Sequence, residues 1–311
     1  FAAGFDDVVS LGKDSMEFSP TTVATALAEF AGQSSFDLIL TGKAAGMADT
    51  GLVPLLLAQA LSLPLVQDVL EIKPCDDGIA VHCQEPDGVW ERRVRTPLLV
   101  SVGNSPAVLR AVTLRARLAV KAREARTIPA DIHADGVAEQ QFSRPKSRRT
   151  CTFLSGDADE LSERLLSELR SGERHIRSSV QPKAYPKNTI AYDIESIPWY
   201  AASSALKHLL SDCRERRPDF VLLPDTSLGR QLAAGLAAAT NSFSLTGASV
   251  TTDGSITKRV CASNLIWTQT PPLPVVLTMA QLSPDADRIS MDADTAPPAW
   301  LLGEEKITLA S

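Results

Sequence analysis

The sequence predicts an α/β protein built from two similar domains, each with a largely parallel sheet. Short apolar segments alternate with helical segments along the 311 residues, and the same order of segments occurs twice. The composition is that of a globular protein, with 44% hydrophobic and 22% charged residues. Buried strands that alternate with helices form parallel sheets covered on both faces. The length is sufficient for two domains with a core each.

The repeated unit is a helix, a buried strand, a glycine-containing loop, an Ala/Leu helix, an Asp-Gly turn and a Pro-led apolar strand. Equivalent positions (Asp37/Asp219, Gly51/Gly229, Asp77/Asp253 and Pro97/Pro274) are separated by 182, 178, 176 and 177 residues. Near-constant separations in the same order indicate an internal repeat. The decrease from 182 to 178 means that the loop after the first strand is four residues longer in the N-terminal copy. The expected segments are helices 20–31 and 199–216, strands 36–41 and 218–223, helices 52–61 and 231–239, and strands 96–100 and 273–277.

The repeat predicts a domain organisation. We expect a nucleotide-binding-type domain over 1–128, an arm or linker over 129–198, a second domain over 199–303 and a tail over 304–311. The first strand of the first domain is expected to lie before Phe1. The linker contains a basic run and a helix over 157–170, with Asp157 as N-cap and Glu160 in the capping-box position. It is not expected to form a core of its own.

Charge and residue usage exclude several classes of function. A net charge of −6 argues against a general nucleic-acid binder. No apolar run reaches the length of a transmembrane helix, so we expect no membrane insertion. The five scattered cysteines read as reduced thiols in a cytoplasmic protein. The four histidines lack acidic or cysteine partners at ligand spacing and no serine lies in a nucleophile elbow, so we expect neither a metal site nor a catalytic residue.

The loop after the first strand has two interpretations. It runs from Gly42 and Lys43 to Asp49, Thr50 and Gly51, directly before a helix. Ligands of open parallel sheets bind at the carboxyl ends of the strands, and a helix start offers N–H groups to anions, so the loop is a candidate phosphate cradle. Alternatively, Asp49 or Thr50 only caps the helix, because the loop is neither G-x-G-x-x-G nor a Walker A motif. The equivalent loop, 224–230, is too short to wrap a phosphate, and capping is favoured there.

The segment 106–126 is strongly basic. On a helix, Arg110, Arg117 and Lys121 share one face, and Leu114 and Leu118 lie one turn apart. This pattern fits a solvated face beside a packed apolar seam. It also fits a docking element, with a leucine anchor surrounded by positive charge that binds an acidic partner.

Residues 1–172 resemble the beta subunit of the electron transfer flavoproteins. The resemblance lies in four places: Asp37-Leu38-Ile39-Leu40-Thr41-Gly42-Lys43 with Asp49-Thr50-Gly51, Asp87-Gly88-Val89-Trp90-Glu91, Val112-Thr113-Leu114 with Lys121, and Arg144-Pro145-Lys146 with Asp159-Glu160-Leu161. They resemble, in order, the family's AMP or second-FAD loop, its turn with a glutamate near the flavin, its leucine-anchored recognition loop and its C-terminal arm.

Residues 175–279 resemble the first domain of the alpha subunit of the same family. Thr226-Ser227-Leu228-Gly229-Arg230-Gln231-Leu232-Ala233 is close to that subunit's T-S-x-G-R-D-L-A, and Lys258-Arg259 with Ser263-Asn264-Leu265 stands where the family has T-R…G-N-L. The resemblance implies two pseudo-symmetric flavodoxin- or Rossmann-like domains of the adenine nucleotide alpha hydrolase type. The alpha subunit's flavin domain, with its S-G-G-R-G motif, is not seen in the sequence.

The resemblance implies an electron carrier rather than an enzyme with its own substrate. It would move electrons from a flavin-dependent dehydrogenase to an acceptor such as a quinone oxidoreductase, with FAD as cofactor and AMP in some members. Glu91 and Arg259 would lie near the flavin, and Leu114 would anchor the dehydrogenase. The main FAD-binding domain would come from a separate chain, from a homodimer or from further along the polypeptide. Two alternatives are a non-redox adenine-nucleotide-binding module and a docking scaffold.

Overall fold

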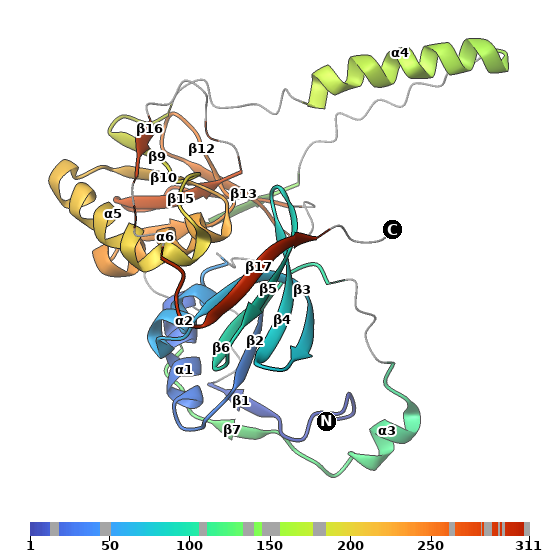
Figure 1. The fold of residues 1–311 in the computed structure, drawn as a ribbon, viewed down its shortest axis with the longest axis vertical. Helices are drawn as coiled ribbons and strands as arrows, with labels where there is room; N and C mark the ends of the chain where they lie inside the picture. The colour runs from blue at the N-terminus through green and yellow to red at the C-terminus, as the bar shows by residue number, and fades with distance from the viewer. Residues whose placement is uncertain are drawn as a thin grey trace.

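The computed structural model shows two sheet-based halves that lie against one another (Figure 1). Helix α2 (Val53–Leu61) of the first half packs on helix α6 (Ser227–Thr240) of the second. The structure describes residues 1–12, 19–43, 51–105, 111–132, 140–144, 156–176, 185–260, 265–280, 282, 288–291, 293 and 296–307. None of the helices within these ranges is long and apolar enough to cross a membrane.

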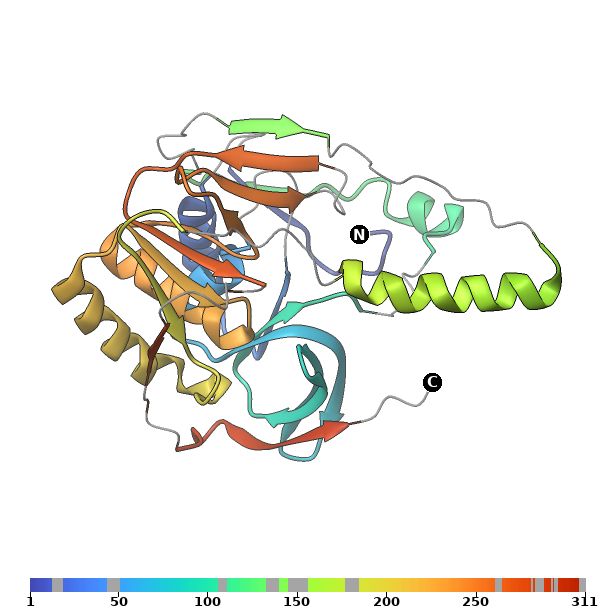
Figure 2. The ribbon, with the colours of Figure 1, turned by 90° about the horizontal axis from the view of Figure 1, so that it is seen from above.

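The N-terminal half contains a curled mixed sheet with the strand order β17-β5-β4-β3-β6-β2. Strands β2 and β3 pair with β6 in parallel, and the remaining pairs are antiparallel. Figure 2 shows the curl of the antiparallel part. Helices α1 (Pro20–Ala31) and α2 pack together, and α2 packs on β3 and β6. The strands are β2 (Leu38–Gly42), β3 (Leu65–Cys75), β4 (Gly78–Glu85), β5 (Gly88–Val94), β6 (Leu98–Val102) and β17 (Leu301–Ile307).

The last strand, β17, belongs to the sheet of the first half. It returns from the second half and pairs antiparallel with β5 (Figure 1). The boundary expected at 303/304, with a tail after it, falls inside β17. The sequence pattern could not reveal the pairing, because the partner strand lies about 200 residues earlier and a short half-exposed strand carries no information on its partner.

The C-terminal half has three layers. Its central sheet is parallel throughout, with the order β11-β15-β10-β9-β16. Helices α5 (Ala202–Arg216) and α6 lie on one face, and an antiparallel sheet of order β12-β13-β14-β8 lies on the other. The strands are β8 (Gln140–Ser143), β9 (Thr189–Asp193), β10 (Phe220–Pro224), β11 (Phe243–Leu245), β12 (Ser249–Val250), β13 (Ile256–Val260), β14 (Leu265–Gln269), β15 (Val275–Met279) and β16 (Arg288–Ser290).

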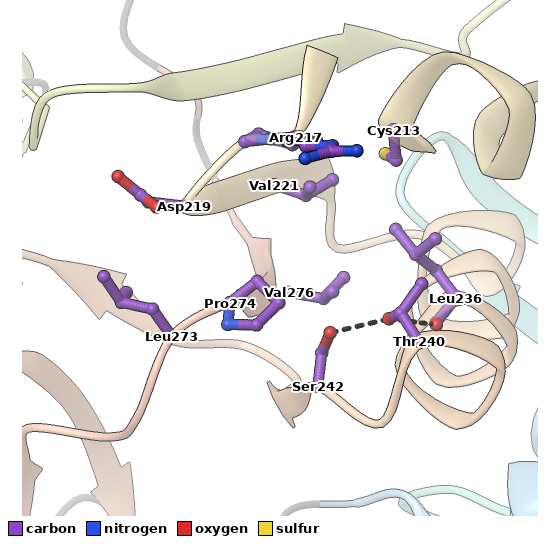
Figure 3. Close-up of a pocket in the computed structure, with 11 residues that line it drawn as sticks. Cys213, Arg217, Asp219, Val221, Leu236, Thr240, Ser242, Leu273, Pro274 and Val276 are labelled. Atoms are coloured by element: carbon purple, nitrogen blue, oxygen red, sulfur yellow. Dashed lines mark hydrogen bonds between the residues drawn. The ribbon is translucent and has the colours of Figure 1, made fainter. Parts of the chain in front are cut away.

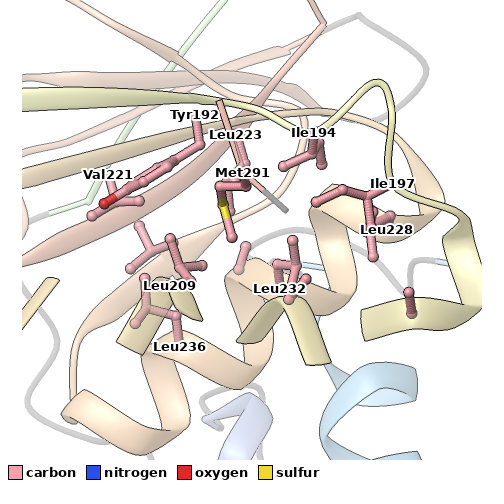
Figure 4. Close-up of a cluster of buried hydrophobic side chains, with 14 of the residues drawn as sticks. Tyr192, Ile194, Ile197, Leu209, Val221, Leu223, Leu228, Leu232, Leu236 and Met291 are labelled. Carbon is pink, nitrogen blue, oxygen red and sulfur yellow. The ribbon is translucent and has the colours of Figure 1, made fainter. Parts of the chain in front are cut away.

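Side chains of β10 alternate between two cores. Val221 and Leu223 face the helices and pack with Leu232 of α6, as Figure 4 shows. Phe220 and Leu222 face the antiparallel sheet and pack in the cluster that contains the fully buried Trp267. Successive side chains of a strand point to opposite faces, so one strand supplies both cores. Burial of these side chains on both faces fixes the position of β10, the strand that leads into the crevice described below.

The internal repeat is confirmed by the topology. The order β3-β6-β2 in the first sheet matches β11-β15-β10 in the second. Helix α1 matches the predicted range, and the predicted helix 199–216 is a short 3-10 turn, η1 (Trp199–Ala201), followed by α5. Helix α6 begins at Ser227 rather than at residue 231, because the Thr226 hydroxyl accepts a hydrogen bond from the Gly229 amide and caps the helix four residues earlier.

The segment expected as a linker contributes to several sheets. Within it, β8 pairs with β14, and β9 is part of the second parallel sheet. Directly before it, β7 (Arg126–Ile128) pairs with β1 (Val9–Leu11). The parallel pair β1–β7 matches the pair β9–β16 in chain order, but it forms a two-stranded sheet of its own, whereas β9 also pairs with β10 in the second parallel sheet. The strand expected before Phe1 stays a prediction. The short acidic approach to β1 gave little strand signal in the sequence.

Helix α4 (Ala158–Ile176) stands apart from both sheets (Figures 1 and 2). Asp157 accepts hydrogen bonds from the amides of Asp159 and Glu160, as expected of the N-cap. The helix continues six residues beyond the predicted end at Arg170. Its exposed leucines, Leu165 and Leu166, are each 52% exposed, so α4 adds no core to either half.

A ligand crevice between the two halves

A crevice of about 660 Å³ lies where the carboxyl ends of strands from both halves meet. Lys43 follows β2, Gly103 and Asn104 follow β6, and Asp225 follows β10; all of them line it. Thr226, at the start of α6, also lines the crevice. Ligands of open parallel sheets bind at this edge, where loops and helix starts converge. The fold therefore places the crevice at the position expected of a ligand site.

Asp68 lies at the centre of the charged groups in this crevice. Its carboxylate is 2.6 Å from the Lys43 ammonium through Oδ1 and hydrogen bonds to the Arg230 guanidinium through Oδ2. The Arg230 and Asp68 side chains are about one-tenth exposed, whereas Lys43 is half exposed. Lys43 and Asp68 come from the first half and Arg230 from the second. The Asp68–Arg230 pair thus joins the two halves across the crevice.

A bulge in β3 makes this arrangement possible. The pairing of β3 with β6 changes register between Val66 and Val69, and Asp68 has a φ of 54°. In a regular strand, Gln67 and Asp68 would point to opposite faces. At the bulge, both side chains contact Arg230, with Gln67 Oε1 accepting from Arg230 Nε at 3.1 Å. Gly103 permits the bulge, because a Cβ there would lie 3.2 Å from the Asp68 backbone.

The start of α6 is held against the first half by further hydrogen bonds. Gln67 Nε2 donates to the Ser227 carbonyl oxygen at 2.8 Å, and the Ser227 hydroxyl donates to Glu85 at 2.9 Å. Asp225 Oδ1 accepts from the Thr278 hydroxyl at 2.6 Å and is 3.6 Å from Arg230 Nη1. Each of these groups has a defined partner. The crevice wall is therefore preorganised.

A second cavity of about 630 Å³ adjoins the crevice along Glu85, Pro86 and Thr226. The buried Arg92 of β5 lies between two carboxylates, 3.0 Å from Glu85 and 3.3 Å from Glu304. Its guanidinium stacks over the Trp199 ring at 4.1 Å, and the Trp199 indole N–H donates to Glu304 at 2.8 Å. This cluster joins β5, β17 and η1, and it lines the second cavity beside the crevice. We therefore interpret it as part of the contact between the halves.

Three of the candidate phosphate-loop residues lie at this edge. Gly42 ends β2 beside Val102, and the Lys43 amide donates to the Val102 carbonyl at 3.1 Å. Gly51 has a φ of 73°, and a Cβ there would lie 2.6 Å from the Thr246 hydroxyl of the second half. Glycine at position 51 is therefore required by close approach of the halves. Asp49 and Thr50 lie outside the described residues.

Glu91 and Arg259 are not brought into the crevice. Glu91 lies on the face of β5 opposite to Arg92, and its carboxylate is 3.0 Å from Nε2 of the buried His82. His82 Nδ1 is 3.1 Å from Glu71, whose pKa is lowered chiefly by a hydrogen bond from Lys73. Arg259 is exposed on β13 of the antiparallel sheet. Cys83 of β4 lies on the same side of the sheet as Arg92, and burial raises the pKa of its thiol to about 11.

The basic segment forms a shorter helix than its pattern suggested. Helix α3 spans only Leu114–Ala119, because Thr113 caps it through a hydrogen bond from the Ala116 amide. Residues 111–113 are not helical and Lys121 follows the helix, so one helical face does not join Arg110, Arg117 and Lys121; Arg110 itself lies outside the described residues. Leu114 and Leu118 are 72% and 61% exposed. The packed apolar seam considered above is not formed in the chain as described.

A separate hollow of about 340 Å³ lies at the opposite end of the second parallel sheet (Figure 3). Val221, Leu236 and Val276 converge on it, and the Thr240 and Ser242 hydroxyls hydrogen bond to each other at 2.6 Å beside it. It lies at the amino ends of β10 and β15, away from the edge where α/β sheets bind ligands. We therefore place the candidate site in the crevice and not here.

The pairing of Asp68 with Arg230, which defines the crevice, was not predicted from the sequence. Arg230 was noticed only as part of the T-S-L-G-R motif, and Gln67 and Asp68 were not singled out. An Asp inside a run of apolar strand residues, Leu65-Val66-Gln67-Asp68-Val69-Leu70, was the available signal. It shows that a carboxylate interrupts a buried strand, but it does not show which cation meets it.

Comparison with known proteins is consistent with this geometry. The family model of the electron transfer flavoprotein domain matches residues 1–132. The N-terminal part of the chain is similar to the electron transfer flavoproteins. One relative, "Putative electron transfer flavoprotein subunit YgcR" of Escherichia coli (strain K12), is 29% identical over 186 residues, which cover 58% of this chain and 69% of the relative. The family match covers the half that supplies Lys43, Gln67 and Asp68, and the paired α/β halves agree with the fold expected of the family.

Proposed function

We propose that this protein carries electrons from a flavin-dependent dehydrogenase to an acceptor such as a quinone oxidoreductase. The observation that supports the proposal most is the family match over residues 1–132, combined with a second α/β half locked against it. In this proposal FAD supplies the redox chemistry when it is bound, and the protein positions it and tunes its surroundings. The described residues provide the rigid base: the Asp68–Arg230 pair and the stacking of Arg92 on Trp199 hold the two halves in one orientation.

The flavin is the first thing to test. The protein is purified in the presence of excess FAD, alone and together with a separately expressed flavin-domain chain of an electron transfer flavoprotein. We expect retained FAD, seen as flavin absorbance, and bleaching of that absorbance when a flavin dehydrogenase and its substrate are added without oxygen. A preparation that never retains flavin under either condition would remove the electron-carrier proposal and leave a non-redox role.

The exposed leucine of α3 is the proposed contact for the dehydrogenase. Leu114 is 72% exposed, and the exposed Arg115 and Arg117 of α3 and Lys121 just after it add positive charge to the same segment. Exposed apolar anchors with a charged rim are typical of transient docking sites. We expect Leu114→Ala to slow reduction by the dehydrogenase about tenfold, which corresponds to roughly 1.4 kcal/mol of lost binding.

The matched control for this prediction is Leu165→Ala on α4, which removes an exposed leucine from a helix elsewhere on the surface. The control should reduce at the wild-type rate, and both variants should keep the wild-type melting temperature because neither side chain is buried. Equal rates for Leu114→Ala and wild type would show that α3 is not the docking site.

A second candidate function is a non-redox module that binds an adenine nucleotide. The crevice, with Lys43 directly after β2 and Arg230 in the first turn of α6, favours it. The fit is incomplete, however, because a phosphate at Lys43 would meet the carboxylate of Asp68. Nucleotide titration of flavin-free protein distinguishes this candidate: tight AMP binding without any flavin retention supports the module, and flavin retention with reduction by a dehydrogenase supports the carrier.

A further inference from the structure

The crevice contains two cations that already have an anion from the same chain. Lys43 Nζ is 2.6 Å from Asp68 Oδ1, and Arg230 hydrogen bonds to Asp68 Oδ2. One carboxylate thus bridges an ammonium and a guanidinium that come from different halves. Two cations about one small anionic group is the arrangement that proteins use to bind phosphate. The Asp68 carboxylate stands in the position that an oxyanion would take.

We propose that Lys43 and Arg230 form an oxyanion site between the halves, and that Asp68 is its built-in competitor. Asp68 lowers the affinity of the crevice for phosphate-bearing ligands. While its carboxylate is in place, a phosphate that enters the crevice either displaces the carboxylate or is repelled by its negative charge. The inference rests on the proposal that the crevice is a ligand site. It does not depend on which ligand the electron-carrier role would use.

The other nearby carboxylates have different commitments. Glu85 is paired with Arg92 at 3.0 Å and accepts from the Ser227 hydroxyl. Asp225 accepts from Thr278 at 2.6 Å and lies 3.6 Å from Arg230, beyond hydrogen-bond distance. With Asp68 present, the charges of Lys43, Arg230, Asp68 and Asp225 cancel. Without it they leave one positive charge facing the crevice, which favours an anion.

The backbone shows that Asp68 is held in this position by the fold. The bulge, the φ of 54° and the glycine at 103 together direct the Asp68 carboxylate toward Arg230 instead of away from it. A non-glycine residue at positive φ is disfavoured and persists only where its surroundings determine it. Asparagine tolerates this conformation well, so Asp68→Asn removes the charge without opposing the backbone.

The test is a calorimetric titration of the full chain, freed of flavin, with inorganic pyrophosphate and with AMP. We expect Asp68→Asn to bind pyrophosphate at least about tenfold more tightly than wild type, with the affinity falling as salt is raised. Lys43→Met in the Asp68→Asn background should abolish the gain. The matched control, Asp212→Asn, removes a carboxylate from an Asp–Arg pair on α5 and should leave the affinity unchanged.

Asp68→Gly serves as a second variant, because glycine accepts positive φ and also removes the carboxylate. If both Asp68 variants are folded and bind pyrophosphate no more tightly than wild type, the inference is overturned. A gain for pyrophosphate and AMP alike assigns the site to nucleotides, and a gain for pyrophosphate alone assigns it to small oxyanions; both support Asp68 as competitor. Failure of flavin retention would overturn the electron-carrier proposal only, since these titrations need no flavin.

Discussion

Replacing Arg230 by methionine should lower the free energy of unfolding by about 3 kcal/mol. Arg230 Nη2 bonds to Asp68, its Nε donates to Gln67, and the side chain is only 9% exposed. Methionine fills similar space, so packing is largely kept. The Asp68 carboxylate, itself 10% exposed, would then be left with Lys43 as its near cation. Removing one partner of a buried ion pair is costly because the other charge stays desolvated.

Urea unfolding, followed by circular dichroism, measures this loss. The control is Arg216→Met, which removes an arginine from an i,i+4 pair with Asp212 on the surface of α5. Because Arg216 is exposed and its pair is screened by solvent, we expect a much smaller change there. A double-mutant cycle with Asp68→Asn isolates the Asp68–Arg230 coupling. If Arg230→Met unfolds at the same urea concentration as Arg216→Met, the contact between the halves does not stabilise the protein as argued.

The repeat was predictable because local patterns encode it. Apolar runs at 36–41 and 218–223, the following Ala/Leu helices and the Pro-led strands each occur twice at similar spacing, and the structure places them in the same sheet order. Such features depend on a few neighbouring residues and on periodicity. Capping was also predictable at Asp157, because the carboxylate acceptor and the amides that donate to it lie within three residues.

The contacts that join the halves were not predictable, because the residues in contact lie far apart in the sequence. The pair Asp68–Arg230 spans 162 residues, and the contact between Trp199 and Glu304 spans 105. Sequence pattern gives the type of each residue and leaves its distant partner open. The same holds for β17, whose partner β5 lies about 200 residues earlier in the chain. For the candidate site, the edge of the sheet, Gly42, Lys43 and Gly51 followed from the sequence, whereas the carboxylate that neutralises Lys43 required the bulge in β3.

Close packing between β10 and α6 explains why glycine occupies position 229. A Cβ at Gly229 would lie 1.9 Å from the Pro224 carbonyl oxygen and 3.0 Å from its carbonyl carbon. Both are backbone atoms at the end of a buried strand, so neither can rotate away. We expect Gly229→Ala to lower the free energy of unfolding by about 2–3 kcal/mol, as overpacking of a dense core does. It should also weaken the Asp68–Arg230 coupling, because α6 must shift and Arg230 is its next residue.

Gly235→Ala in the same helix is the matched control. There the added Cβ would lie 2.6 Å from Leu206 Cδ2, the end of a side chain that can change rotamer. Alanine favours the helix over glycine by about 1 kcal/mol, which offsets the repacking of Leu206. We therefore expect urea unfolding of Gly235→Ala close to wild type and a clear loss for Gly229→Ala. Equal stabilities for the two variants would mean that α6 can move away from β10 at little cost, and the fixed geometry of the crevice would no longer follow from this contact.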